Sequence, residues 1–509
     1  MNALKSWIKM GLLLFAAVMT ISSIAPGIVW AESNDKIQKI EQYVKNQQSI
    51  SKIPGISLVI VEKGETVYQK GFGYANVKTK TPVTSDTLFE IGSTTKAFTG
   101  LAILQLEKQG LLHRTDDVQK YIPWLELTYH GVPQKITINQ LLHHTSGIAS
   151  NMITRIPESK ADNALELTVK TLQGQTLNRK PGSSFEYATI NYDVLGLIIE
   201  VVSNMPYDQY MKQYILDRIG MTSSFVGVPS TQPDLMASGY KIGWMKHRPF
   251  TPPIYRGNTP AGYIVSNAND IAKWIKLQLK SAPEQVIDPK LIEESHNPDK
   301  SVNPFDQKTY YANGWAVMSK SKEKVVFHAG ENPSFTSYFI LQPDQQLGVA
   351  ILANMNTSYT TAIGQGVMDL WKGQAPAVNH TDSYQLLDRI VSILEIIVIL
   401  FGVLWIALSA RIVRKLAVKQ RRRSPLTGKR KLLLLIHIGM VAAVLIFISM
   451  LPTILLGGLP WAFIQVWAPT SIPVFLYSVI TACILYFIYG LLLLFTKKNE
   501  KPIGLDYNK

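Results

Sequence analysis

Ser93 and Lys96 lie three positions apart in the sequence Ser-Thr-Thr-Lys, directly before an apolar stretch with helical spacing. Residues i and i+3 share one face of a helix, so an amine at the second position can take the proton of the serine hydroxyl and make its oxygen a nucleophile. The positive end of a helix and burial both disfavour an ammonium, so we expect Lys96 to act as an uncharged amine. The spacing would allow covalent catalysis by a serine.

The Ser-x-x-Lys spacing by itself carries little information. It occurs seven times in this chain, and an arbitrary copy is most simply a solvated pair on a helix. The copies begin at Ser6, Ser33, Ser49, Ser93, Ser238, Ser319 and Ser321. Only the copy at Ser93 has Gly92 before it and an apolar helix after it, so its assignment depends on the motifs that accompany it.

Five short motifs follow Ser93 along the chain. They are LLHHTSG at 141–147, PGSSFEY at 181–187, PAG at 260–262, NGW at 313–315 and HAG at 328–330. Each is weak alone, but as an ordered set they make residues 35 to 360 resemble the serine beta-lactamase and penicillin-binding-protein superfamily, in its class C-like or D-aminopeptidase-like branch. The resemblance implies a beta-lactamase-like α/β (α+β) fold, with an antiparallel sheet flanked by helices and a helical subdomain.

The same resemblance implies catalytic roles. Ser93 is then the acylated nucleophile, Lys96 is the group that activates it, and Tyr187 is a second general base or acid. A tyrosine can serve as a base near neutral pH only beside a cation, which Lys96 can supply. The resemblance implies no cofactor.

The HAG motif stands where relatives carry the strand that edges the cleft. The resemblance implies that the backbone N–H groups of Ser93 and Glu331 form an oxyanion hole, and that Gly330 lets the substrate backbone approach. His328 is either a hydrogen-bond donor on the cleft wall or a packed side chain.

Thr189 and Asn332 are the predicted substrate-binding residues. Relatives often have asparagine at the position of Thr189, so the shorter hydroxyl here puts penicillin-like substrates in doubt and favours a specialised one. Asn332 falls on the His328 side of a regular strand, where its carboxamide can pair with that of a substrate. A plain asparagine at a strand end, with Pro333 terminating the strand, explains the position equally well.

His143 and His144 are adjacent and invite a zinc interpretation. Neighbouring residues do not share a face, and no third histidine or carboxylate has suitable spacing, so we predict no metal site and a structural role in a loop.

The elements that must position these residues come in three groups. A helical pattern begins at residue 35, and a hairpin follows with strands at 56–61 and 66–73. Strands at 324–330, 337–342 and 347–354 close the region, and the intervening sequence is mostly helical, as at 98–106, 192–202 and 271–279. Strands at both ends predict one antiparallel sheet built from both ends of the domain, with a helical insert and a cleft at their junction.

Three later apolar runs, at 390–410, 432–451 and 472–495, are long enough to cross a bilayer, which takes about 20 apolar residues. We therefore divide the chain into a signal peptide at 1–31, an extracytoplasmic serine hydrolase domain at 32–375, a linker at 376–389, a transmembrane region at 390–495 and a cytoplasmic tail at 496–509. Glu395 lies in the first span, where we expect its carboxylate to snorkel towards water.

The net charge of +15 is concentrated at the membrane segments, because ten basic residues and no acidic ones lie between Arg411 and Lys431. Positive loops stay in the cytoplasm, so the hydrolase domain is predicted outside the cell membrane and the C-terminus inside. The remaining chain is nearly neutral, which excludes a nucleic-acid partner. Cys483 is the only cysteine, which excludes an intrachain disulfide.

A signal, a class C-like hydrolase and three spans together resemble the membrane-bound prodrug-activating D-asparaginyl peptidases of nonribosomal peptide and polyketide pathways. The resemblance implies removal of an N-acyl-D-asparagine cap from an amphiphilic, acylated peptide-like precursor through an acyl-enzyme, which activates an antibiotic. The lipid bilayer is a predicted partner, and an exporter is a further candidate. The alternatives are a cell-wall D,D-peptidase or lactamase-like hydrolase, and a non-catalytic module that binds a ligand and acts on a membrane partner.

Overall fold

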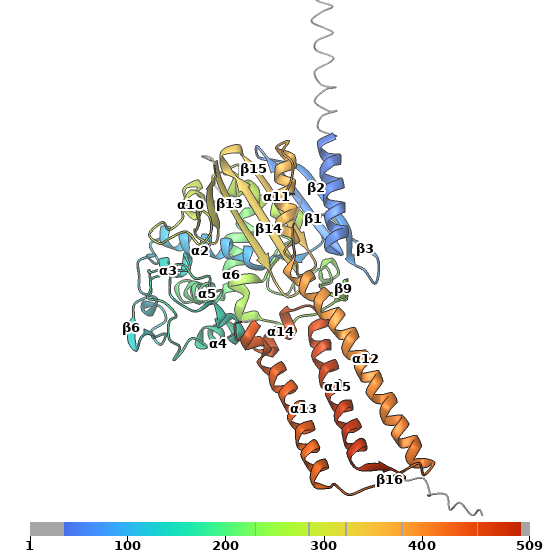
Figure 1. Ribbon diagram of the computed structural model, residues 1–509. Coiled ribbons are helices and arrows are strands. Elements are labelled where there is room, and N and C mark those ends of the chain that lie inside the picture. Colours follow the sequence, from blue (N-terminus) through green and yellow to red (C-terminus); the bar gives the residue numbers. More distant parts are fainter. Residues whose placement is uncertain are drawn as a thin grey trace, which may run out of the picture.

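The structure is a computed structural model that describes residues 35–229, 231–283, 286–320, 323–377, 380–455 and 457–499. The signal peptide predicted at 1–31 and most of the tail predicted at 496–509 lie outside these residues. A globular domain carries three long helices that extend from one of its sides (Figure 1).

Strands from the two ends of the globular domain meet at the centre of one antiparallel sheet. β1 (Gly55–Glu62) pairs with β2 (Glu65–Asn76) on one side and with β15 (Leu347–Ala353) on the other. The eight strands follow the order β11-β12-β13-β14-β15-β1-β2-β3. The remaining strands are β3 (Thr81–Pro82), β11 (Thr309–Tyr311), β12 (Ala316–Lys320), β13 (Glu323–Glu331) and β14 (Thr336–Gln342). The predicted sheet is confirmed.

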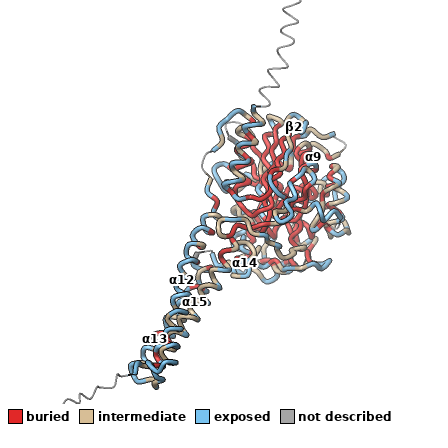
Figure 2. Tube along the Cα trace, turned by 90° about the vertical axis from the view of Figure 1, so that its right-hand side faces the viewer, coloured by how far each residue is buried: buried red, intermediate tan, exposed pale blue. Residues whose placement is uncertain are grey.

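Helices cover both faces of this sheet, which is why β1 is apolar along most of its length. Ile56, Leu58 and Ile60 face a helix at 35–51 and α11 (Tyr359–Trp371). Val59 and Val61 face the opposite way, into the cluster that contains α2 (Thr95–Lys108) and α9 (Ala268–Gln278). Alternate side chains therefore enter two separate cores, and Figure 2 shows the buried residues concentrated in this part of the chain.

The helical insert stands beside the sheet and is organised around α5 (Ile190–Ser203), whose residues 190–199 are all buried. Its other helices are α3 (Ile138–Leu142), α4 (Ala164–Lys170), α6 (Tyr207–Met211), α7 (Asp217–Ile219), α8 (Thr259–Gly262) and α10 (Pro289–Ser295). Two small sheets accompany it: β4 (Phe89–Glu90), β10 (Ile264–Ser266) and β7 (Phe225–Val226) form one, and β5 (Leu127–Tyr129) with β6 (Val132–Gln134) another.

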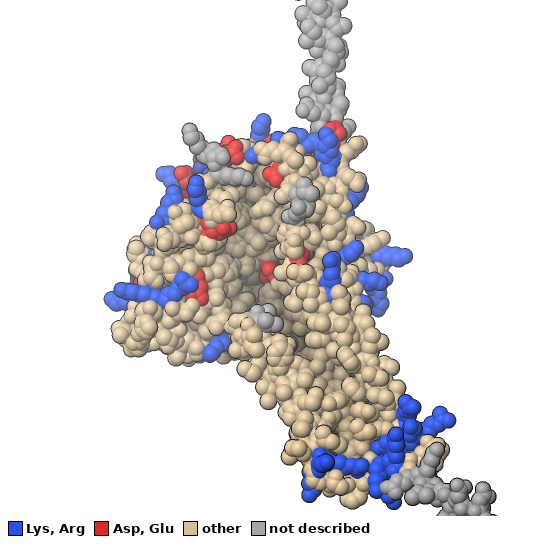
Figure 3. Space-filling model, viewed as in Figure 1, with Lys and Arg blue, Asp and Glu red and all other residues tan. Residues whose placement is uncertain are grey.

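Three helices are long and apolar enough to cross a membrane: α12 (Ser383–Ala417), α13 (Gly428–Leu455) and α15 (Ser471–Leu494). Lysine and arginine side chains gather at their far end, away from the globular domain (Figure 3). There β16 (Arg421–Arg423) pairs with β17 (Thr496–Lys498). α12 begins inside the segment predicted as a linker, because Asp382 caps it by accepting hydrogen bonds from the N–H groups of Tyr384 and Gln385.

A β-hairpin of the globular domain contacts the ends of α12 and α15 that lie nearest to it. The hairpin consists of β8 (Tyr240–Gly243) and β9 (Lys246–Pro249). The Asp388 carboxylate accepts hydrogen bonds from the N–H groups of Trp244 and Met245, at 2.9 and 2.7 Å, and from the Ser471 hydroxyl. Glu395 is buried and accepts a bond from Trp244 Nε1 at 2.7 Å. The expectation that Glu395 snorkels to water was wrong, because a partner from the globular domain reaches it.

Lys241 makes a second attachment on the same hairpin. Its Nζ donates to the carbonyl oxygens of Gln465 and Val466 in α14 (Trp461–Trp467), a short helix that the sequence did not predict. The Thr470 N–H also donates to the Ile242 carbonyl oxygen. Hydrogen bonds from this hairpin therefore connect the globular domain to the helical region at several points.

Candidate active site

Ser93 lies on a tight turn, Gly92–Thr94, between β4 and the start of α2. Lys96 is the second residue of α2, so Ser93 stands on the short turn that leads into this buried helix and Lys96 on the first turn of the helix itself. Lys96 is fully buried while Ser93 is partly exposed, and Lys96 Nζ lies 3.1 Å from Ser93 Oγ. This distance allows direct transfer of the serine proton to the amine.

Lys96 Nζ has two further contacts. It donates to the Ala261 carbonyl oxygen at 2.7 Å and lies 3.0 Å from Thr189 Oγ1. The carbonyl can only accept, whereas the hydroxyls of Thr189 and Ser93 can donate or accept. An uncharged amine can therefore donate to Ala261 and still accept the proton of Ser93, and the resulting ammonium keeps three acceptors.

Tyr187 precedes α5 and forms the opposite wall of the site. Its ring centroid lies 5.1 Å from Lys96 Nζ, and its side chain is partly exposed. The ring centroid of His144 lies 4.3 Å from that of Tyr187, so the two rings pack against each other. The nucleophile, the lysine and the tyrosine are thus brought together by three different segments, around residues 93, 144 and 187.

Two glycines let β13 approach the serine turn. Gly92 has a φ of +53°, and a Cβ there would lie 2.4 Å from the Glu331 backbone nitrogen. A Cβ on Gly330 would lie 2.0 Å from the Ile91 carbonyl oxygen. The Glu331 backbone nitrogen therefore lies beside the serine turn, and the oxyanion hole implied for the N–H groups of Ser93 and Glu331 stays a prediction. Gly330 makes room for the Ile91 backbone, and its predicted role in letting the substrate backbone approach stays a prediction.

His328 is buried on β13 with both ring nitrogens engaged. Nδ1 contacts the Ala329 carbonyl oxygen at 2.7 Å and Nε2 contacts the Tyr311 hydroxyl at 2.9 Å. Because a carbonyl only accepts, Nδ1 carries the proton and Tyr311 donates to Nε2. Burial, and then the positive charge that Lys96 carries whenever it is protonated, lower the pKa of His328 to about 3, so the ring is neutral. The structure favours the packed alternative for His328 over a donor on the cleft wall.

The Glu331 side chain links the site to the first long helix. Its carboxylate accepts a hydrogen bond from the hydroxyl of Tyr384, the second residue of α12. The residue whose backbone nitrogen lies beside the serine turn is therefore hydrogen-bonded to the first turn of α12.

The Beta-lactamase family profile matches residues 38–365, which is more than half of the chain. The chain belongs to this family of serine hydrolases. The matched residues contain the serine turn, Lys96, Tyr187 and β13.

Relatives of this beta-lactamase family member include a protein of Staphylococcus aureus strain N315 named Protein flp. The two are 31% identical over 474 residues, which cover 91% of this chain and 92% of the relative. The putative penicillin-binding protein PbpX of Bacillus subtilis strain 168 is 34% identical over 282 residues, which cover 54% of this chain and 64% of PbpX.

Two solved structures have a similar fold. The octameric penicillin-binding protein homologue from Pyrococcus abyssi matches with a TM-score of 0.60 and 29% identity, over 70% of this chain and 81% of the other. EstCE1, described as a hydrolase with promiscuous acyltransferase activity, matches with a TM-score of 0.57 and 18% identity, over 64% and 94% of the two chains. The second likeness concerns the fold alone.

In this beta-lactamase family member, the two predicted substrate-binding residues have internal partners. Thr189 is buried and its hydroxyl contacts Lys96 Nζ, so it can position the amine, and its part in substrate binding stays a prediction. Asn332 is 2% exposed, and its Nδ2 donates to Glu90 Oε2 at 2.6 Å and to the Gly262 carbonyl oxygen at 3.0 Å. The prediction that Asn332 continues a regular strand was wrong, because β13 ends at Glu331 and the Asn332 N–H bonds to the Phe335 carbonyl oxygen.

Several residues of the site were missed by the sequence interpretation. Ala261 and Tyr311 lie in or beside quoted motifs, PAG and NGW, and their contacts to Lys96 and His328 explain those motifs. Glu90 lies three positions before Ser93, where it reads as an ordinary polar residue of a strand. Its partial burial and its bond to Asn332 could be recognised only in three dimensions.

The adjacent histidines take different places. His144 is buried among the rings of Tyr187, Tyr192 and Tyr311, at centroid distances of 4.3, 5.3 and 4.6 Å. His143 turns away, and its Nδ1 lies 2.8 Å from the Asn139 carbonyl oxygen. Within the described residues, no group of three histidine, cysteine or carboxylate side chains could hold a metal ion.

Proposed function

We propose that this protein is a membrane-anchored, extracytoplasmic serine peptidase that removes an N-acyl-D-amino acid cap, preferably N-acyl-D-asparagine, from a secondary-metabolite precursor. The observation that carries the catalytic part is the 3.1 Å contact between Lys96 Nζ and Ser93 Oγ on a buried helix start. The basic cluster at the far end of the long helices supports an orientation with the hydrolase domain outside the membrane.

The reaction begins when Ser93 Oγ attacks the carbonyl carbon of the cap's C-terminal amide and its proton passes to Lys96. The oxygen of the tetrahedral intermediate gains negative charge, which the N–H groups of Ser93 and Glu331 stabilise; one such donor is worth about 3 kcal/mol. The C–N bond then breaks as the leaving nitrogen takes a proton from Tyr187 or Lys96. An acyl-ester on Ser93 remains, and the amine product leaves.

Water completes the cycle. Tyr187 or Lys96 takes one proton from it, and its oxygen bonds to the ester carbon. The ester C–O bond breaks, Ser93 recovers its proton, and the N-acyl-D-amino acid leaves as a carboxylic acid. The same two groups therefore act as base and acid in both halves, as microscopic reversibility requires.

The preference for asparagine is supported by the acceptors beside the serine turn. The second Glu90 oxygen and the Asn332 Oδ1 atom have no hydrogen bond within the described residues. Two acceptors suit the NH₂ group of a primary carboxamide, which donates two hydrogen bonds. The Asn332 Oδ1 atom would then accept a hydrogen bond from the cap, since the Asn332 NH₂ group already donates to Glu90 and to the Gly262 carbonyl oxygen.

The test uses the full chain in lipid nanodiscs and an aminocoumarin amide of N-octanoyl-D-asparagine. We expect release of aminocoumarin and a preference for the D over the L isomer. When turnover is stopped by acid, the mass of the intact protein should increase by that of the N-octanoyl-D-asparaginyl group. Ser93→Ala should abolish all three while the protein remains folded and inserted. Full turnover by Ser93→Ala would remove the catalytic assignment, whereas a cellular effect that Ser93→Ala keeps without any turnover would favour a non-catalytic module.

A second candidate is a cell-wall D,D-peptidase or lactamase-like hydrolase, which the likeness to PbpX favours. Covalent labelling of Ser93 by a fluorescent penicillin, together with cleavage of a D-alanyl-D-alanine peptide, would support this function. The aminocoumarin amide of N-octanoyl-D-asparagine should then be a poor substrate.

A further inference from the structure

The last four residues of β13 have a strand partner on one side only. β12 pairs with β13 as far as Phe327, whereas β14 continues to Glu331, which lies opposite Thr336. The serine turn borders this end of the strand, because a Cβ on Gly92 would lie 2.4 Å from the Glu331 backbone nitrogen. A strand end with few partners opens easily, so other contacts must keep the Glu331 backbone in place.

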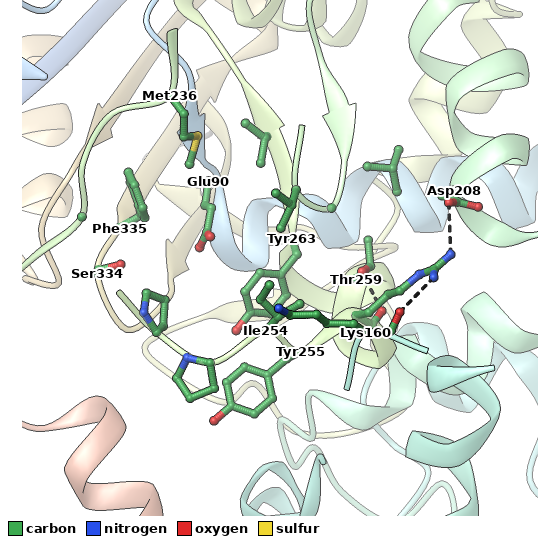
Figure 4. Close-up of a pocket in the computed structure, with 18 of the residues that line it drawn as sticks. Glu90, Lys160, Asp208, Met236, Ile254, Tyr255, Thr259, Tyr263, Ser334 and Phe335 are labelled. Carbon is green, nitrogen blue, oxygen red and sulfur yellow. Dashed lines mark hydrogen bonds and ion pairs between the residues drawn. The ribbon is translucent and has the colours of Figure 1, made fainter. Parts of the chain in front are cut away.

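The turn that follows β13 supplies one set of contacts. The Asn332 N–H donates to the Phe335 carbonyl oxygen at 2.9 Å, and the Asn332 side chain donates to Glu90 and to the Gly262 carbonyl oxygen. Glu90 and Phe335 also line a cavity of about 700 Å³, and Figure 4 shows both beside it. Because this side of the turn borders open space, packing there does not by itself fix Glu331.

The Glu331 side chain makes a contact outside the hydrolase domain. Its carboxylate accepts a hydrogen bond from the hydroxyl of Tyr384 on the first turn of α12. Tyr384 is partly exposed and Glu331 is exposed. Without the hydroxyl, the carboxylate can therefore turn towards water, and β13 loses a restraint at its last residue.

Tyr384 is itself held in place, because Asp382 fixes the start of α12. The Asp382 carboxylate accepts a hydrogen bond from the Tyr384 N–H at 2.7 Å. It also accepts bonds from the Ser358 N–H, at 2.9 Å, and from the Thr357 hydroxyl. The first turn of α12 is thus attached to the segment that follows β15.

This attachment lies at the same end of the sheet as Glu331. Glu331 pairs with Thr336 on β14, and Thr336 pairs with Ala353, the last residue of β15. The three residues form one row across the sheet, so α12 begins beside the ends of both β13 and β15. The sheet itself therefore sets where the Tyr384 hydroxyl meets Glu331.

We propose that Tyr384 is a positioning residue for catalysis. Through the Glu331 carboxylate it holds the end of β13, and with it the Glu331 N–H, where that group stabilises the oxyanion. The proposal rests on the oxyanion step of the proposed function and not on the identity of the cap. It makes the rate of acylation depend on the first turn of a helix that is long enough to cross a membrane.

The experiment compares p-nitrophenyl butyrate with p-nitrophenyl thionobutyrate, on the full chain in nanodiscs. In both, Ser93 Oγ bonds to the carbonyl or thiocarbonyl carbon, its proton passes to Lys96, and p-nitrophenolate leaves. Sulfur is a weak hydrogen-bond acceptor, so an oxyanion hole favours the oxygen ester. Release of p-nitrophenolate before the first turnover is complete gives the acylation rate constant for each ester.

Tyr384→Phe removes the hydroxyl alone. We expect the acylation rate constant for the oxygen ester to fall about tenfold, because a hydrogen bond to a charged group is lost. The half-saturating ester concentration should stay within about twofold, since the change acts on the transition state. The thionoester should be affected less, so the ratio of oxygen-ester to thionoester rate constants should drop at least about threefold.

Glu331→Leu is the second variant, and it serves if Tyr384→Phe does not fold. It keeps the backbone N–H of residue 331 but removes the carboxylate that Tyr384 holds. It should lower the oxygen-to-sulfur ratio as Tyr384→Phe does.

Gln385→Met is the matched control on the same helical turn. The Gln385 Nε2 atom donates to the carbonyl oxygens of Ile50 and Ser51, at 3.2 and 2.7 Å. Its loss weakens the attachment of α12 without removing the contact to Glu331. The unfolding temperature should therefore fall, while the acylation rate constants and the oxygen-to-sulfur ratio should stay at wild-type values.

An unchanged oxygen-to-sulfur ratio in Tyr384→Phe, or the same decrease in Gln385→Met, would overturn the proposal and make Tyr384 a structural contact only. If neither ester acylated Ser93 of the wild type, measured as intact mass, the catalytic assignment would fail and the positioning role with it. Acylation by the esters without cleavage of the N-octanoyl-D-asparagine amide would reject the cap and leave the positioning role of Tyr384 in place.

Discussion

Trp244 Nε1 donates a hydrogen bond to Glu395 Oε2 at 2.7 Å, which joins the tip of the β8–β9 hairpin to a carboxylate inside the first long helix. Asp388, less than two turns earlier on α12, binds the backbone of the same hairpin tip. Contact with this hairpin tip thus explains why the apolar helix α12 carries two acidic residues, Asp388 and Glu395, in this part of its length. The long helices thus hold the hydrolase domain in a defined position.

Trp244→Phe should destabilise the protein by about 1–3 kcal/mol, because it leaves the buried Glu395 carboxylate without its donor. The measurement is the free energy of unfolding followed by circular dichroism in a single detergent. A double-mutant cycle with Glu395→Leu isolates the pair, and we expect a coupling of at least about 1 kcal/mol. Additive effects of the two changes would mean that the contact contributes nothing to stability.

Gly330→Ala should disrupt the approach of β13 to the serine turn, since its Cβ would lie 2.0 Å from the Ile91 carbonyl oxygen. Overpacking of this kind costs about 1–3 kcal/mol, and the Glu331 N–H should move with the strand. We expect a lower unfolding temperature and a kcat reduced at least about tenfold. Gly439→Ala is the control, because nothing lies within 4 Å of a Cβ there; equal behaviour of the two variants would contradict this reading of β13.

Thr189→Val should lower kcat by about 10- to 100-fold. The ammonium that forms when Lys96 takes the Ser93 proton would lose one of its acceptors, and a hydrogen bond to a charged group is worth about 1.5–3 kcal/mol. Thr189→Ser restores the hydroxyl and should recover most of the rate. Steady-state kinetics on the octanoyl substrate give both values. If the valine variant instead raised KM with kcat unchanged, Thr189 would bind substrate rather than position the amine.

Lys241→Met should change how stability depends on pH. Burial lowers the pKa of Lys241 from 10.5 to about 7. Between these values the unfolded chain holds a proton that the folded protein has released, so the stability of the wild type should rise as pH increases through this range. In Lys241→Met the rise from pH 7 to pH 9 should be smaller, measured as the unfolding midpoint at several pH values.

Lys246→Met is the control for this change, because Lys246 lies on the same hairpin and is exposed. Its stability profile should follow the wild type. Identical slopes in all three proteins would show that Lys241 keeps its proton when folded.

The parts of the fold that the sequence predicted well depend on local pattern. The β-branched run at 56–61 and the strands at 324–354 have strand composition and turn residues between them, so their pairing into one sheet followed from packing rules. Ser93 and Lys96 were recognisable because their geometry is set within one helical turn. Tyr187 was placed by resemblance alone.

What the sequence could not predict depends on contacts between distant segments. The orientation of Asn332 was extrapolated from the two-residue period of β13, but a turn closed by its bond to Phe335 rotates the side chain towards Glu90. The hairpin tip at Trp244 has no local signal that it contacts residue 395. Burial of Glu90 likewise arises from segments more than 150 residues away.

The pairing of β1 with β15 has a consequence for synthesis. A ribosome delivers residues 55–62 almost 300 positions before their partner at 347–353, so the middle of the sheet stays open during most of translation. The central pairing of the sheet therefore cannot form until nearly all of the hydrolase domain has been made. Closure of the sheet then comes just before the first long helix is synthesised.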